Sequence, residues 1–401
     1  MANTDNDVAE VLAALQQQDH EGWVRACSIV EGWGDELTAA HRELCLALAD
    51  RMRADRSLGD YGVDRRHGLA EEAQMFDSIV FRFARKPGAD VAAMLIDVCH
   101  RLAARGVDHP LRRTVYWMAR THSIVDVLDL FRRGDHRAPQ ESWTVLLHEY
   151  VAWGNDLSAD ETVTRYLAMV KESDHRLGIL PARLVEGELP PPSSTSETSE
   201  GIEHAPTSVP EQPSQPDIGR VFDDSVVLTR AWERRDLVAP YRSWLDQDMN
   251  ARADGAVVRF DRPVGLGDVK AATLARLSIE SMSGPTPPVL RRISAPRACQ
   301  EIQIHAGQGG AYDGGLGHAY GRLAKWQCIA ALAGVSDLRF LHPADMSPNT
   351  VVTVMQRAEA CAWWRFHGTW WFWNADGWGG GFAVLRPEGR TLAVSAAADI
   401  D

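Results

Sequence analysis

Five side chains that could act as acids, bases or proton donors fall within sixteen positions of one glycine-rich stretch. They are His305, Tyr312, Asp313, His318 and Tyr320. Histidine has an ordinary pKa near neutral pH, so a histidine that is oriented by a carboxylate can serve as a general base. The spacing gives a catalytic hypothesis in which His318 is the base, Asp313 orients it and His305 is a further candidate.

The same residues raise a metal hypothesis, because two histidines and an aspartate are ordinary zinc ligands. The stretch has no H-x-x-x-H pattern on one helix and no spacing that matches a familiar metal site. The cysteines are widely spaced and form no C-x-x-C pair, which is typical of core residues in a reducing compartment. They are Cys27, Cys45, Cys99, Cys299, Cys328 and Cys361. We therefore predict no bound metal and no cofactor.

The glycines of "GGAYDGGLGHAYG", residues 309–321, suggest a phosphate-binding loop at first sight. A dinucleotide fingerprint G-x-G-x-x-G must follow a strand and open a helix. Here Gly315 and Gly317 are followed by Gly321, one residue too far, and the preceding segment has a helical pattern. The interpretation that we favour is structural: the glycines allow the chain to cross closely between two helices.

Tryptophans form a second candidate site. Six of them fall within sixteen residues, at positions 363, 364, 370, 371, 373 and 378. On a strand over 369–373 both faces would be aromatic, either as a binding platform or as a central strand that is buried on both sides. The binding candidates are Trp370, Trp371, Trp373, Trp378, Tyr312 and Tyr320, with His367, Asn374 and Asp376 as polar neighbours.

The elements that must position these residues follow from periodicity. Residues 1–185 carry repeated helical patterns with short joints, which predicts an all-α domain of helical hairpins. Residues 186–218 are rich in Pro, Ser and Glu and lack aromatic residues, which predicts a disordered acidic linker. Residues 219–401 predict an α+β domain with a small antiparallel sheet, so that the fold class is α+β overall.

Within the C-terminal domain the pattern predicts particular elements. Helices are expected over 223–249, 265–282, 295–306, 318–333 and 349–363. Strands are expected over 255–264, 288–294 and 369–373, and a β-meander closes the chain over 380–401.

Composition limits the class of partner. The net charge is −13, and seven of the acids lie in residues 186–218, which leaves −6 for the rest of the chain. An acidic surface repels nucleic acid and anionic lipid. No apolar run reaches the roughly 20 residues of a membrane span, and the start of the chain lacks a secretory signal. We expect a cytoplasmic protein with a protein partner, and neither nucleic acid nor a membrane.

The C-terminal domain also resembles a known family. The combination of "GGAYDGGLGHAYGRLAKWQCIAALAG", a Trp-rich strand and the ending "AVLRPEGRTLAVSAAADID" is similar to an uncharacterised actinobacterial protein family of unknown function. The resemblance covers the last 100 to 180 residues best. It implies no catalytic residues, and it supports the domain prediction only.

Two functional hypotheses follow. The first is a non-catalytic protein for interaction or regulation, in which two domains recruit a protein partner. The second is an enzyme that acts on a small polar substrate, such as a glycoside or nucleoside, where the glycine-rich stretch meets the Trp-rich strand. Convergence of His305, Asp313 and His318 on one pocket would favour the enzyme.

Overall fold

A computed structural model describes most of the chain, in ranges separated by short gaps. These are residues 4–17, 20–34, 38–52, 69–134, 136–173, 175–191, 217–247, 251–308, 315–335, 349–368, 372 and 378–399. The chain divides into two compact units, Met1–Trp153 (unit 1) and Gly154–Asp401 (unit 2). The division falls earlier than the sequence-based boundary at residue 185, because the last helix before the linker belongs to unit 2.

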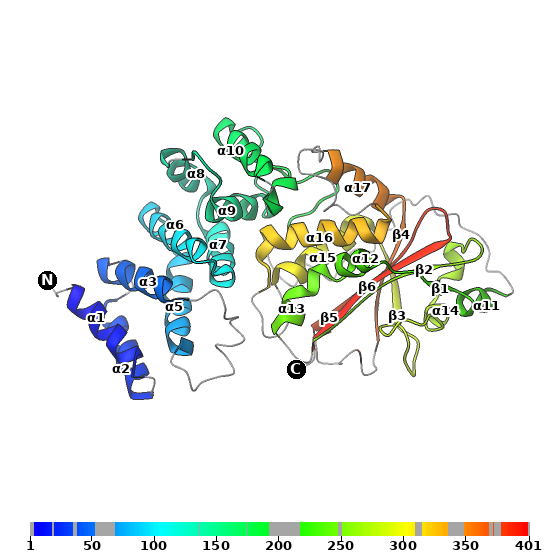
Figure 1. Ribbon diagram of the computed structural model, residues 1–401, viewed down its shortest axis with the longest axis horizontal. Helices are drawn as coiled ribbons and strands as arrows, with labels where there is room; N and C mark the ends of the chain where they lie inside the picture. The colour runs from blue at the N-terminus through cyan, green and yellow to red at the C-terminus, as the bar shows by residue number, and fades with distance from the viewer. Residues whose placement is uncertain are drawn as a thin grey trace. The chain divides into compact units, whose positions relative to one another are not determined.

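Unit 1 is all-helical in its described residues, as expected (Figure 1). Its helices are α1 (Thr4–Leu15), α2 (His20–Gly32), α3 (Ala39–Arg51), α5 (Leu69–Ala84), α6 (Ala89–Ala104), α7 (Asp108–Thr121), α8 (Ile124–Arg133) and α9 (Glu141–Ala152). Side-chain caps fix several starts: Thr38 accepts a hydrogen bond from the His41 amide, and Ser123 accepts one from the Val125 amide. Helix α9 is buried from Ser142 to Ala152 and packs against α6 and α7.

Unit 2 combines helices with one sheet (Figure 1). The helices are α10 (Glu161–Glu172), η1 (Arg176–Ile179), α11 (Ile218–Asp223), α12 (Ala231–Leu237), η3 (Ala239–Tyr241), α13 (Arg242–Gln247), η4 (Leu266–Asp268), α14 (Ala271–Leu274), α15 (Ala295–Gln308), α16 (Gly317–Ala333) and α17 (Asn349–Glu359). The strands are β1 (Val226–Val227), β2 (Arg252–Arg259), β3 (Val289–Ile293), β4 (Ala362–His367), β5 (Trp378–Leu385) and β6 (Thr391–Asp399).

The sheet has six antiparallel strands in the order β1-β2-β6-β5-β4-β3. The predicted α+β class is therefore confirmed. Helix α17 ends at Glu359, so the prediction of a helix to residue 363 is wrong. Trp363 and Trp364 instead lie in β4, where pairing with β3 and β5 favours aromatic residues.

The predicted helix over 223–249 is wrong in extent, because β1, α12, η3 and α13 form in the described part of that range. The helix that the sequence predicts over 265–282 is also wrong in extent. Only η4 and α14 form there, and the hydroxyl of Thr273 donates to the carbonyl of Asp268 at 2.7 Å, which ties the two short helices together. The apolar side chains that gave the helical pattern, such as Leu277 and Met282, are buried under the sheet from irregular backbone. A helical spacing of apolar residues can therefore also arise where the residues are buried from irregular backbone.

Both faces of the sheet are covered. Val258, Phe366 and Val394 lie in the core on the face that packs against α11, α14 and the irregular residues around α14, such as Val264 and Ile279. The other face packs against α12, α15 and α16 (Figure 1) and carries small residues where helices come close. A Cβ atom on Gly255 would lie 2.9 Å from the Cβ of Leu237 in α12. The missing side chain of Gly255 thus lets β2 and α12 approach each other closely.

The predicted linker needs a correction at its beginning. Residues 186–191 are described, and Glu188 is 5% exposed with both carboxylate oxygens in hydrogen bonds. The acidic composition placed this segment in a disordered linker, but two buried cations hold Glu188 in unit 2. Residues 192–216 of the predicted linker lie outside the described residues, and Ile218 begins α11.

Helices α15 and α16 cross closely at glycine residues. A Cβ atom on Gly321 would lie 3.0 Å from the backbone nitrogen of Gly307, and Gly315 and Gly317 have φ angles of 65° and 67°. Such angles favour glycine. The structural interpretation is confirmed for these glycines, whereas residues 309–314 lie outside the described residues.

Gly321→Ala should lower the free energy of unfolding of unit 2 by about 1–3 kcal/mol, because the new methyl group must push two backbones apart. Gly32→Ala is the matched control, since a Cβ atom at this helical position meets nothing within 4 Å. Alanine there should be neutral or stabilising by up to about 1 kcal/mol. Urea unfolding of both variants tests the crossing, and an equal effect of the two changes would contradict it.

No helix among the described residues is both long enough and apolar enough to cross a bilayer.

Candidate functional site

His305 lies on α15 against the sheet. A Cβ atom on Gly380 of β5 would lie 2.6 Å from the Cε1 atom of His305, so the ring fills the space that this glycine leaves. Its ring also contacts Tyr241, Trp244 and Phe382 at centroid distances of 5.9–6.2 Å. Burial, with a smaller effect from the charge of Arg365, lowers the pKa of His305 to about 4. The imidazole is therefore neutral at physiological pH.

His318 is fully buried in the first turn of α16. It faces α15, where a Cβ atom on Gly307 would lie 2.3 Å from its Nδ1 atom. Positions 305 and 307 point about 200° apart on one helix. The two rings therefore pack on different neighbours. The ring of His305 packs on the sheet, and the ring of His318 packs on α15.

The remaining predicted site residues have mixed placements. Tyr320 is half-buried on α16, His367 is exposed at the end of β4, and Trp378 begins β5. The others lie outside the described residues: Tyr312, Asp313, Trp370, Trp371, Trp373, Asn374 and Asp376. Of the three proposed catalytic residues, the structure thus places the two histidines and leaves the catalytic hypothesis a prediction.

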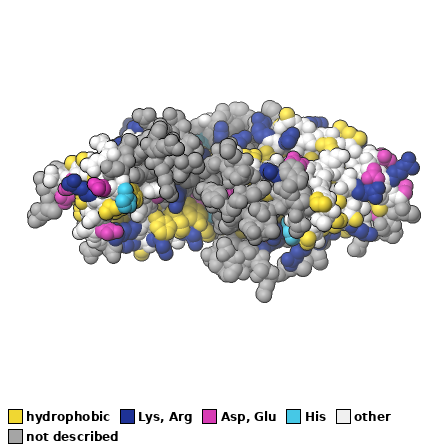
Figure 2. All heavy atoms as spheres, turned by 90° about the horizontal axis from the view of Figure 1, so that it is seen from below, with side chains coloured by type: hydrophobic (Ala, Val, Ile, Leu, Met, Phe, Trp, Pro, Cys, Tyr) yellow, Lys and Arg dark blue, Asp and Glu magenta, His cyan; other side chains and the backbone are white. Residues whose placement is uncertain are grey.

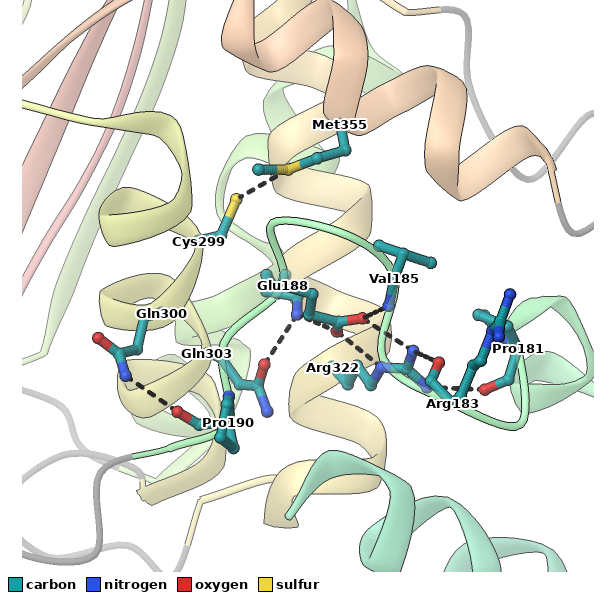
Figure 3. Close-up of polar contacts among 11 residues, drawn as sticks. Pro181, Arg183, Val185, Glu188, Pro190, Cys299, Gln300, Gln303, Arg322 and Met355 are labelled. Atoms are coloured by element: carbon teal, nitrogen blue, oxygen red, sulfur yellow. Dashed lines mark hydrogen bonds and ion pairs between the residues drawn. The ribbon is translucent and has the colours of Figure 1, made fainter. Parts of the chain in front are cut away.

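The most concentrated group of buried charges lies elsewhere, where the segment 176–191 (the strap) meets α15 and α16 (Figure 3). Glu188 of the strap accepts hydrogen bonds from Arg322 Nε at 2.7 Å and from Arg322 Nη2 at 2.9 Å. Lys325 Nζ also donates to Glu188, and to Gln303 Oε1 at 2.8 Å. We call Glu188, Gln303, Arg322 and Lys325 the ion cluster.

Backbone groups complete the ion cluster. Arg322 donates to the carbonyl of Pro181 at 3.0 Å and to that of Arg183 at 2.8 Å, and the amide of Val185 donates to Glu188 at 3.1 Å (Figure 3). Both ion pairs have fully buried side chains. One guanidinium thus binds a carboxylate and two backbone carbonyl groups of the strap, which fixes this irregular segment on the helices.

Burial and the charge of the ion partner act in opposite directions on the pKa of Glu188 and on that of Lys325. Burial alone would raise the pKa of Glu188, but the charges of Lys325 and Arg322 outweigh it and hold that pKa well below its usual range. Burial lowers the pKa of Lys325 although Glu188 opposes the change. One carboxylate lies between two basic groups, and the donors of Arg322 and Lys325 are directed at protein groups. The cluster is therefore suited to holding the strap on the helices.

Unit 1 carries a different kind of group on its surface. Tyr116, Trp117 and Arg120 lie on one side of α7, beside Phe81 of α5 and Trp153 at the end of α9. We call these five residues the aromatic cluster. The guanidinium of Arg120 lies 5.3–5.4 Å from three ring centroids, those of Tyr116, Trp117 and Trp153. It also donates to the Tyr116 hydroxyl at 2.9 Å.

The aromatic cluster is accessible in part. Arg120 is exposed and the four aromatic side chains are half-buried. The rings of Phe81 and Trp117 meet edge to face with centroids 4.8 Å apart, and Tyr116 meets Trp117 at 5.0 Å. Packed aromatic residues with an arginine at their centre form a rigid surface of the type that dominates the energy of protein interfaces.

Other chemistry finds little support in the described residues. Five of the six cysteines are buried, and burial raises the thiol pKa of Cys45, Cys299, Cys328 and Cys361 to about 12. These thiols are protonated and poorly nucleophilic near neutral pH. Among the residues with described placement, no group of three or more His, Cys, Asp or Glu could hold a metal ion.

Surface charge is of mixed sign. Exposed ion pairs join Arg25 to Glu10 in unit 1 and Arg276 to Asp223 in unit 2. Figure 2 shows Lys and Arg side chains beside Asp and Glu side chains at the left and right edges of the face that it draws. At these two edges positive and negative side chains are thus interspersed.

Sequence reasoning missed both clusters. Glu188 was counted among the linker acids, and the only signal of its role was the pair Arg322 and Lys325 three positions apart in a helix with few other charges. The aromatic cluster had a clearer signal, since "YWMAR" places Tyr116 and Trp117 four and three residues before Arg120. That spacing brings the side chains together on a helix.

Comparison with models of protein families matches residues 35–401 to a family of unknown function (DUF6183). Searches of curated proteins and of solved structures give no match.

Proposed function

The chain belongs to the DUF6183 family of unknown function, and we propose that it is a non-catalytic interaction or regulatory protein whose unit 1 binds a protein partner through the aromatic cluster. The observation that carries the proposal is the arrangement of Tyr116, Trp117 and Trp153 around one exposed arginine, Arg120. Tyr, Trp and Arg are the residue types that are enriched at the energetic centres of interfaces.

The geometry of the cluster suits binding. Each ring is held by a neighbour, so little side-chain entropy is lost when a partner covers it. Arg120 is exposed, and its guanidinium can donate two hydrogen bonds to one carboxylate in a bidentate pair. The expected partner surface therefore combines an apolar or aromatic side chain with an Asp or Glu.

The contacts of the buried polar side chains in unit 2 support a role without catalysis. Arg322 directs its donors at the strap, and His305 and His318 pack against Gly380 and Gly307. None of the six cysteines is in a disulfide bond, which supports a reducing compartment, so we place the role in the cytoplasm.

Affinity capture with the tagged full chain tests the proposal. Arg120→Glu reverses the charge at the centre of the aromatic cluster, and Arg132→Glu makes the same change at an exposed position of α8. We expect one protein to co-purify with the wild type and with Arg132→Glu, and to be lost with Arg120→Glu. Thermal melting of both variants checks that the fold is intact. Equal recovery of the same protein with all three chains would contradict the proposal.

A further inference from the structure

One edge of the sheet presents exposed apolar side chains. Val226 and Val227 of β1 and the following Leu228 are 54%, 43% and 51% exposed. Strand β1 lies at the end of the sheet and pairs with β2 on its inner side (Figure 1). An edge strand leaves a row of backbone groups for another strand to pair with, and proteins usually protect such an edge with charge or proline.

The direction of the backbone groups follows from the ladder. Val227 lies opposite Val258, and the amide of Leu228 donates to the carbonyl of Val257 at 2.8 Å. In an antiparallel pair, consecutive residues direct their N–H and C=O groups to opposite sides. The backbone groups of Val227 therefore point away from β2, toward the edge of the sheet where no described strand pairs with β1.

We propose that a second copy of this chain docks on β1, so that segments 224–230 of the two copies pair antiparallel about a two-fold axis at Val227. Each Val227 then exchanges both backbone hydrogen bonds with the Val227 of the other copy. Val226 of each copy lies opposite Leu228 of the other, which covers the exposed apolar side chains on both sides of the axis.

Charge complementarity selects a second copy of this chain as the occupant. In this register Asp224, which precedes the apolar residues, lies opposite Arg230, which follows them. Both residues are exposed, and the 3.5 Å pair of Asp224 with Arg220 lies on the surface, where it is easily exchanged. The segment "DSVVLTR" is thus complementary to itself when the direction is reversed.

The opposite edge of the sheet shows the protection that β1 lacks. Strand β3 has the sequence "VLRRI", and Arg291 lies opposite Arg365 of β4. If β3 paired with the β3 strand of a second copy, the arginines of that copy would lie beside Arg291 and Arg365 and repel them. The contrast between the two edges identifies β1 as the edge that is open to pairing.

Sedimentation equilibrium of the full chain over about 1 to about 100 μM tests the proposal, since dimerisation depends on concentration. We expect a dimer with a dissociation constant in the micromolar range, because the pairing segment is short. Val227→Pro removes a donor that points to the open edge and breaks no bond to β2, so it should give a monomer with an unchanged melting temperature. Val226→Lys should weaken the dimer at least about tenfold, and Val289→Lys, equally exposed on β3, should not.

Exchanging the charges at positions 224 and 230 tests the register of the two paired strands. Arg230→Asp should weaken the dimer, and the double variant Asp224→Arg with Arg230→Asp should restore it. A wild-type chain that is monomeric at about 100 μM would overturn the proposal, including the case in which β1 instead pairs with a strand of another protein. A dimer that survives Val227→Pro, or that the double variant does not restore, would overturn the proposed pairing.

Discussion

Glu188→Gln should lower the free energy of unfolding of unit 2 by about 3–5 kcal/mol, the usual cost of breaking a buried ion pair from one side. The amide would leave Arg322 and Lys325 buried without a countercharge, and both side chains are fully buried now. The strap would also lose the group that both cations bind. Urea unfolding followed by tryptophan fluorescence measures the change, because Trp244 and Trp326 are buried in the same unit.

Two controls make this expectation specific. Glu186→Gln removes the same charge from an exposed position of the strap and should change stability by about 0.5 kcal/mol or less. Lys325→Met leaves Glu188 and Arg322 as a balanced pair, so it should cost less than Glu188→Gln. If Lys325→Met proved the more destabilising of the two, the charge balance that we assign to the ion cluster would be incorrect.

The same cluster gives unit 2 a dependence on acid. The folded pKa of Glu188 lies below its value in the unfolded chain, which is about 4.3 for an ordinary glutamate. Its contribution to stability is therefore fully present above that value and is lost as the pH falls below it. The acid limb of the stability curve should be shallower in Glu188→Gln than in the wild type.

Trp363→Ala should lower the free energy of unfolding of unit 2 by about 3–5 kcal/mol, the usual cost of emptying a large aromatic site. Trp363 is 1% exposed in β4, and its indole N–H donates to the carbonyl of Ala358 at the end of α17 at 2.7 Å. The change removes both the packing of the ring and the bond that ties α17 to the sheet. Differential scanning calorimetry of the full chain measures the loss.

Trp363→Phe separates the contribution of the ring packing from that of the hydrogen bond, since phenylalanine keeps most of the packing and cannot donate to Ala358. We expect it to cost about 1–3 kcal/mol, because the carbonyl of Ala358 loses a buried donor. Val289→Ala, on the exposed edge strand beside β4, should be close to neutral. A Trp363→Ala protein that melts with the wild type would show that this ring is not part of the core.

Periodic patterns predicted the fold well where a single helix or strand determines its own hydrophobic face. The all-helical unit 1, α15, α16 and the closing meander follow from such patterns. The pattern misled where burial came from tertiary contact: Leu277 and Met282 are buried without a helix, and Trp363 and Trp364 continue a helical pattern but pair as a strand. Local periodicity cannot distinguish these cases, because strand partners are distant in sequence.

The candidate sites were harder to predict. Composition assigned Glu188 to a disordered linker, since its two cationic partners lie more than 130 positions away in the chain. His318 and His305 attracted attention by type, but each fills the space that a glycine leaves in a neighbouring element. The aromatic cluster was open to prediction from the helical spacing of Tyr116 and Arg120 alone. Its contacts with Phe81 and Trp153 needed the fold.

The affinity of the captured partner for the full chain tests the central claim most directly, by isothermal titration calorimetry with the wild type and Trp117→Ala. Our account predicts that the dissociation constant rises about 30-fold or more, as for a residue that contributes about 2 kcal/mol to an interface. The melting temperature of the variant must stay near that of the wild type. An unchanged dissociation constant for Trp117→Ala and for Arg120→Ala would contradict binding through the aromatic cluster.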